Sequence, residues 1–72
     1  MFRKRSITLN GHATSLALEP EFWAVIDDAL ATEGGSLARL IARIDEARKP
    51  GQPLSSACRV WALSQLRANK AA

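Results

Sequence analysis

Hydrophobic and polar residues alternate with a period of two along the N-terminal part of the chain, a pattern that predicts half-buried β-strands. The apolar members of each run share one face: Ile7, Leu9, Leu16 and Leu18. Asn10-Gly11 lies between the runs and suits a hairpin, because both central residues of a type I′ turn need positive φ. His12 and Ala13 interrupt the second arm. We therefore expect a strand over residues 14–18, and a basic arm or hairpin strand within residues 1–12.

Three segments with helical periodicity follow. Pro20 suits the first turn of one helix, and Gly34-Gly35 suits its end. Ser36 is a typical N-cap for the second helix, and Ser55 or Ser56 is expected to cap a third helix over residues 54–69. Trp23 is expected at the edge of the first apolar stripe. The stripes are Phe22, Val25, Ile26, Ala29 and Leu30; Leu37, Leu40, Ile41 and Ile44; and Ala57, Val60, Trp61 and Ser64, with Leu63 beside them.

The composition indicates one small globular domain, with 72 residues of which 47% are hydrophobic. A core of this size contributes only about 3–5 kcal/mol unless it is reinforced. Cys58 and His12 are single, so one chain can form neither a disulfide nor a His/Cys metal cluster. We therefore expect a homodimer without metal or cofactor, and no enzyme. No apolar run approaches the roughly 20 residues of a membrane span, so a cytoplasmic protein is expected.

Charge is segregated along the chain, although the net charge is only +3. Residues 1–18 carry three basic side chains and no acidic one, whereas residues 19–33 carry five acidic side chains and no basic one. A basic segment beside an acidic one makes an electrostatic dipole, which suits a protein that binds a polyanion with one face.

The segment from Thr14 to Trp23, the helix after it and the Gly35-Ser36-Leu37 turn resemble the ribbon-helix-helix DNA-binding family over residues 13–48. The flanking segments Arg3–Leu9 and Pro50–Ala57 are similar to those of small bacterial ribbon-helix-helix proteins. The resemblance implies a mainly α-helical homodimer with a short β-ribbon, in which the strands of two chains pair. Here an N-terminal arm or strand and an additional C-terminal helix would extend a core at residues 13–49.

In this family the ribbon enters the major groove and the N-terminus of the second helix binds a phosphate. The resemblance thus implies base contacts from Ala13, Ser15 and Ala17. It implies contacts to the DNA backbone from Arg3, Lys4, Arg5, Thr14, Gly35, Ser36, Leu37 and Arg39.

We therefore expect a transcriptional regulator, most simply a repressor, that binds double-stranded DNA as a dimer or a dimer of dimers and is associated with the nucleoid when bound. Two alternatives remain. One is an antitoxin with a toxin protein as partner. The other is a protein-interaction dimer without specific DNA binding, which the small side chains of Ala13 and Ala17 favour.

Overall fold

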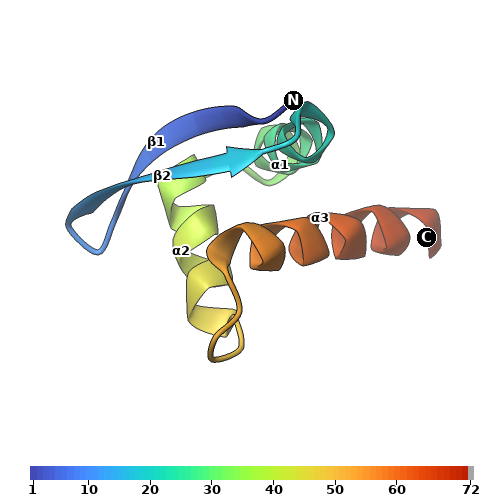
Figure 1. Ribbon diagram of the computed structural model, residues 1–72. Coiled ribbons are helices and arrows are strands. Elements are labelled where there is room, and N and C mark those ends of the chain that lie inside the picture. The colour runs from blue at the N-terminus through green and yellow to red at the C-terminus, as the bar shows by residue number, and fades with distance from the viewer. Residues whose placement is uncertain (72) are drawn as a thin grey trace.

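The computed structural model describes residues 1–71 and forms an antiparallel two-stranded sheet followed by three helices (Figure 1). The elements are β1 (Arg3–Leu9), β2 (His12–Leu18), α1 (Pro20–Glu33), α2 (Leu37–Ala47) and α3 (Leu54–Ala71). This is the ribbon-helix-helix order that the sequence predicts, with one additional strand and one additional helix.

Asn10 and Gly11 form the hairpin turn, with φ of 51° and 80°. Both values are positive, as a type I′ turn requires. The turn sets the register from the Leu9–His12 pair at the tip to the Arg3–Leu18 pair at the open end. The basic N-terminal residues therefore lie in β1 and do not form a free arm, and the second strand begins earlier than the predicted residue 14.

The helix ends follow local sequence signals. Pro20 opens α1, and Gly34 ends it with φ of 80° while its amide donates to the carbonyl of Leu30. The hydroxyl of Ser36 accepts from the amide of Arg39 at 3.2 Å and caps α2. The prediction that Ser55 or Ser56 caps α3 is wrong. The helix begins at Leu54, and the carbonyl of Pro53 accepts from the amide of Ala57 at 3.1 Å, so both serines lie inside the first turn.

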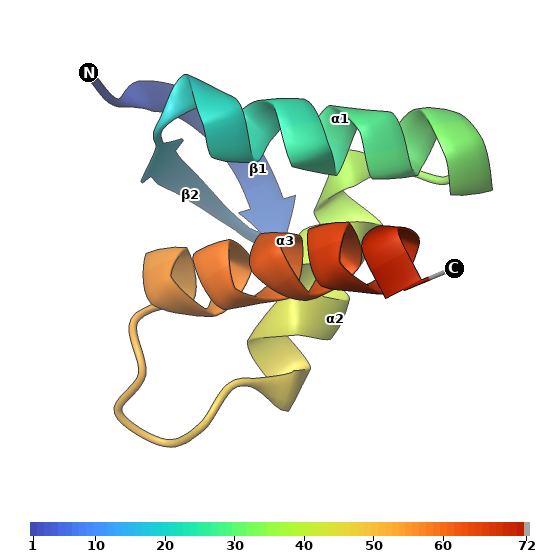
Figure 2. The same cartoon turned by 90° about the vertical axis from the view of Figure 1, so that its right-hand side faces the viewer.

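The core lies between the hairpin and the helices. Helix α2 packs against β1, and α3 packs against β2, α1 and α2. In Figures 1 and 2, α2 lies steeply across the other two helices. The buried residues form one cluster: Ile7, Leu16, Leu18, Trp23, Ile26, Leu40, Ile41, Ile44, Ala57 and Cys58. Both strands and all three helices therefore contribute to one continuous core.

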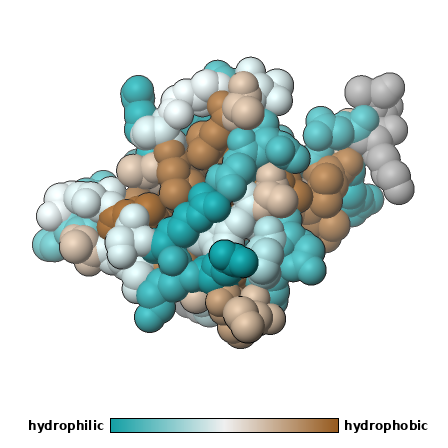
Figure 3. Space-filling view, turned by 90° about the horizontal axis from the view of Figure 1, so that it is seen from above, coloured by the Kyte–Doolittle hydropathy of each residue, from teal (hydrophilic) through white to brown (hydrophobic). Residues whose placement is uncertain are grey.

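The predicted stripe of α3 is only partly right. Ala57, Cys58 and Ala62 are buried, and Trp61 is half-buried. Val60, Leu63 and Leu66 are 55%, 53% and 50% exposed. Small side chains therefore form the most buried part of α3, with Leu54 and Trp61 packed partly against the core beside them. Viewed from above, a hydrophobic patch lies where α3 ends (Figure 3).

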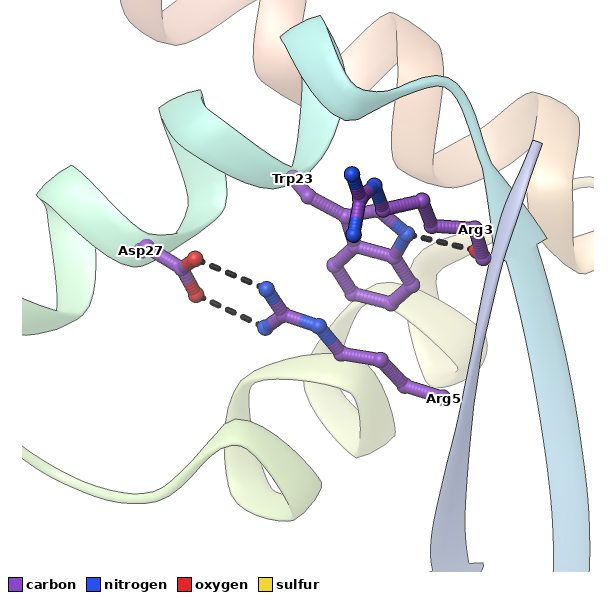
Figure 4. Close-up of polar contacts among 4 residues, drawn as sticks. All are labelled: Arg3, Arg5, Trp23 and Asp27. Atoms are coloured by element: carbon purple, nitrogen blue, oxygen red, sulfur yellow. Dashed lines mark hydrogen bonds and ion pairs between the residues drawn. The ribbon is translucent and has the colours of Figure 1, made fainter. Parts of the chain in front are cut away.

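Trp23 is buried at 2% exposure rather than at the edge of the core. Its indole Nε1 donates to the backbone carbonyl of Arg3 at 2.8 Å. The guanidinium of Arg5 lies 4.3 Å from the Trp23 ring centroid and donates to both carboxylate oxygens of Asp27, at 2.8 and 2.9 Å (Figure 4). We call Arg5, Trp23 and Asp27 the strand clamp, because they join β1 to α1.

A second ion pair joins the start of α1 to α3. Arg59 Nε donates to Glu19 Oε1 at 2.9 Å, and the guanidinium carbon of Arg59 lies 5.9 Å from the Phe22 ring centroid. Phe22, predicted to be a core residue, is half-buried beside this contact. Hydrogen bonds from the backbone amide of Glu19 and from Arg59 hold the pKa of the Glu19 carboxyl below its usual range.

None of the three helices described between residues 1 and 71 has the length and apolar character that a membrane span requires.

The strand clamp predicts a specific stability change. Asp27→Asn should lower the free energy of unfolding by about 1 kcal/mol at neutral pH, because it breaks a bidentate pair that is partly open to solvent. Asp28→Asn is the matched control. It changes the same charge one residue away, where the described residues form no ion pair, and should stay within about 0.5 kcal/mol of the wild type. Urea unfolding measures both.

The difference should also depend on pH. The hydrogen bonds from Arg5 hold the pKa of Asp27 below its ordinary value of 3.8. These hydrogen bonds contribute fully to the free energy of unfolding at pH values above 3.8. Their contribution is lost as the pH falls through the lower pKa that Asp27 has in the folded protein. The gap between wild type and Asp27→Asn should therefore close in acid. A gap that does not change with pH, or an equal loss in Asp28→Asn, would contradict the clamp.

Cys58 tests the packing of α3. Its side chain is fully buried, and burial raises the pKa of its thiol to about 11. Since the thiolate is the reactive form, alkylation at pH 8 should be on the order of a hundredfold slower in the native protein than in the urea-unfolded chain. Cys58→Ala supplies the background rate. Equal rates in the two states would show that α3 does not pack this thiol against the rest of the core.

Candidate nucleic-acid interface

The hairpin has one face that no helix covers. Directly opposite residues of an antiparallel pair lie on the same face, and faces alternate along each strand. The predicted base contacts Ala13, Ser15 and Ala17 therefore lie on one face together with three residues of β1. This outer face consists of the pairs Lys4–Ala17, Ser6–Ser15 and Thr8–Ala13. Five of its residues are exposed and Ala17 is half-buried, whereas Ile7, Leu16 and Leu18 on the inner face are buried.

The hydroxyl groups of the outer face are available to a ligand. Ser6 and Ser15 face each other across the two strands, and Thr8 lies one pair nearer the turn. None of these three hydroxyls hydrogen-bonds to another described residue. Each can donate and accept, so each can contact a base edge or a phosphate oxygen.

Three residues that were predicted to contact the DNA backbone lie on the inner face of the sheet. Thr14 is opposite Ile7, so it shares the inner face although its side chain is exposed near the turn. Arg3 and Arg5 also belong to the inner face. Arg5 is engaged with Trp23 and Asp27, and its hydrogen bonds to Asp27 raise its pKa, so it remains charged in the clamp. Of the three basic residues in β1, only Lys4 shares a face with Ser15.

The N-terminus of α2 forms a second, separate site. Gly34 and Gly35 have φ of 80° and 95°, which turns the chain so that Ser36 can cap the helix. The amides of Leu37 and Ala38 precede the first intrahelical bond, from Leu40 to Ser36. Such amides and the helix dipole favour an anion.

The surroundings of this helix start are of mixed charge. A hollow of about 580 Å³ lies beside it, lined by Arg39 and Arg43 but also by Glu33 and Glu46. The predicted contacts Gly35, Ser36, Leu37 and Arg39 are thus brought together, away from the outer face of the hairpin.

The sequence reasoning missed Ser6 and Thr8 as members of the outer face. The signal was present, because Ser6 and Thr8 alternate with Ile7 and Leu9 on either side of a turn that sets the register. Without a definite hairpin, however, nothing placed them beside Ser15.

The chain was compared with known proteins. A family model described as a ribbon-helix-helix domain matches residues 2–66. Searches of curated proteins and of solved structures found no match. The matched residues include both strands, α1, α2 and most of α3, and the chain belongs to the ribbon-helix-helix domain family.

Proposed function

We propose that this protein is a DNA-binding transcriptional regulator that acts as a homodimer and represses by occupying an operator. Ribbon-helix-helix domains generally bind DNA as transcription regulators or antitoxins. The observation that carries the proposal is the uncovered outer face of the hairpin, whose free hydroxyls and Lys4 suit base edges and phosphates.

Two further observations support this function. The capped start of α2 presents free amides with Arg39 one turn further on, an arrangement that suits a phosphate. Two acidic residues of the segment 19–33 are already paired, Asp27 with Arg5 and Glu19 with Arg59, so they repel an approaching polyanion less than the sequence indicates.

Dimer formation is supported by two surfaces that one chain leaves open. Helix α3 exposes Val60, Leu63 and Leu66, and the second edge of β2 has no partner strand within residues 1–71. A dimer also allows two half-sites to be contacted, and two dimers could occupy adjacent sites.

A protein-interaction dimer without specific DNA binding is the second candidate, because the same exposed residues of α3 suit a protein partner. DNA binding distinguishes the candidates. A protein that binds no duplex at low salt would favour this second function.

The first experiment measures binding to the DNA upstream of its own gene and to random duplex over a range of salt concentrations. Because phosphate neutralisation releases counterions, log K should fall with log salt by about 0.9 per phosphate contacted. A repressor should also prefer the upstream fragment. Steep salt dependence without any preference would contradict specific recognition.

Arg39→Gln tests the second site. It should weaken binding to upstream and random duplex alike and reduce the salt slope by about 1 per chain, because Arg39 would contact a phosphate and no base. Arg67→Gln is the matched control, since Arg67 is an exposed residue of α3 outside both proposed contact sites. An unchanged slope in Arg39→Gln, or an equal change in Arg67→Gln, would remove the start of α2 from the interface.

A further inference from the structure

β1 occupies one edge of β2 and leaves the other edge open. The two strands pair from Arg3–Leu18 to Leu9–His12, and the second edge of β2 has no partner strand within residues 1–71. Under the proposed function, the β2 strands of two chains pair along this open edge and form the ribbon that enters the major groove. The dimer then has a four-stranded sheet, with the two β2 strands at its centre and one β1 strand on each side.

β1 is held to the body of its own chain. Ile7 is buried in the core, and Arg5 is held by Asp27 and Trp23. The carbonyl of Arg3 accepts a hydrogen bond from the Trp23 indole. Pairing at the open edge of β2 breaks none of these contacts, so β1 flanks the ribbon in the dimer.

The spacing of the strands places β1 beside the phosphates. Neighbouring strands lie about 4.8 Å apart, so the two β2 strands fit a major groove that is about 12 Å wide. The two β1 strands are about 14 Å apart, which is wider than the groove. The phosphate backbones of the two DNA strands form the walls of the groove. The β2 strands therefore face the base edges, and each β1 strand lies over one wall.

The side chains that β1 turns toward the DNA suit phosphates. Lys4, Ser6 and Thr8 share the outer face, are exposed and can each donate a hydrogen bond. The two hydroxyls form no hydrogen bond to another described residue. The outer face carries no carboxylate, because residues 1–18 contain no acidic side chain. Donors and a positive charge without an opposing carboxylate favour a phosphate backbone.

The short side chains of β2 allow β1 to reach the phosphates. On the outer face β2 has only Ala13, Ser15 and Ala17, which are no longer than the Ser6 and Thr8 side chains opposite them. Long side chains on β2 would contact the base edges first and hold the flanking strands away from the DNA. With short ones, the whole outer face can approach.

We propose that the outer face of β1 binds the phosphate backbone on either side of the ribbon, through Ser6 and Thr8 together with Lys4. This inference rests on the proposed function, DNA binding by a dimer, and adds a phosphate-binding element besides the start of α2. Ser6 and Thr8 then contribute affinity for any duplex, and the choice of sequence belongs to β2.

The experiment uses the full chain with the upstream and random duplexes of the salt titration. Ser6→Ala/Thr8→Val removes both hydroxyls and keeps a branched residue that suits a strand. The variant should lose roughly tenfold in affinity for both duplexes, because phosphate contacts carry no sequence information. Its salt slope should not change, since no charge is removed. Its thermal midpoint should not change either, because both side chains are exposed.

Lys4→Gln tests the charge of the same face and should reduce the salt slope by about 0.9 per chain. Lys49→Gln is the matched control and should leave the slope unchanged. It removes the same charge from an exposed residue just after α2, at the end of that helix remote from the sheet (Figure 1). Thr32→Val is the control for the lost hydroxyls. Thr32 is an exposed residue of α1, outside the outer face, so this variant should bind as the wild type does.

The outcomes separate the inference from the function beneath it. If Ser6→Ala/Thr8→Val loses affinity for the upstream duplex alone, β1 contacts bases and the inference is wrong. Unchanged binding to both duplexes would remove β1 from the interface and also overturn it. If the wild type binds neither duplex, the proposed function itself fails. If the wild type binds both equally, specific recognition fails, whereas an equal loss in the variant still supports phosphate binding by β1.

Discussion

A two-stranded hairpin holds its shape in water only when one of its faces is covered. In this protein the helices cover the inner face through Ile7, Leu16 and Leu18, and α3 completes the cover by packing against β2 and both other helices. Its small buried residues Ala57, Cys58 and Ala62 allow that close approach. Everything on the outer face depends on this packing, because it decides which side of each strand remains in water.

The segregated charges of the sequence have a structural use. The basic N-terminal strand and the acidic first helix meet in the pair of Arg5 and Asp27, which lies against the Trp23 ring. Arg59 of α3 likewise meets Glu19 at the start of α1. Part of the charge that is segregated along the chain is thus neutralised by ion pairs within the fold. The remaining basic residues near DNA under our proposal, Lys4 and Arg39, are exposed.

Alternation along β1 separates the residues that hold the strand to the helices from those that stay in solvent. Arg3, Arg5 and Ile7 hold the strand to the helices, while Lys4, Ser6 and Thr8 point the other way. A substitution on the inner face is therefore expected to act mainly on stability. This division explains how a short hairpin can be both firmly held and open to a ligand.

Local chemistry in the sequence determined the turn at Asn10-Gly11, the caps at Gly34 and Ser36, the order of the elements and the faces of the strands. These features depend on φ preferences, hydrogen bonding to nearby amides and a period of two, all of which act between near neighbours. The tertiary structure alone decided which face of α3 is buried, because apolar residues occur around most of that helix and the stripe that its periodicity predicted is only partly the buried one. It also decided the burial of Trp23 and the partner of Arg5, since both depend on how closely β1 approaches α1 across about twenty residues of chain. The buried face of α3, the burial of Trp23 and the partner of Arg5 all depend on steric fit between distant segments, which no local sequence pattern encodes.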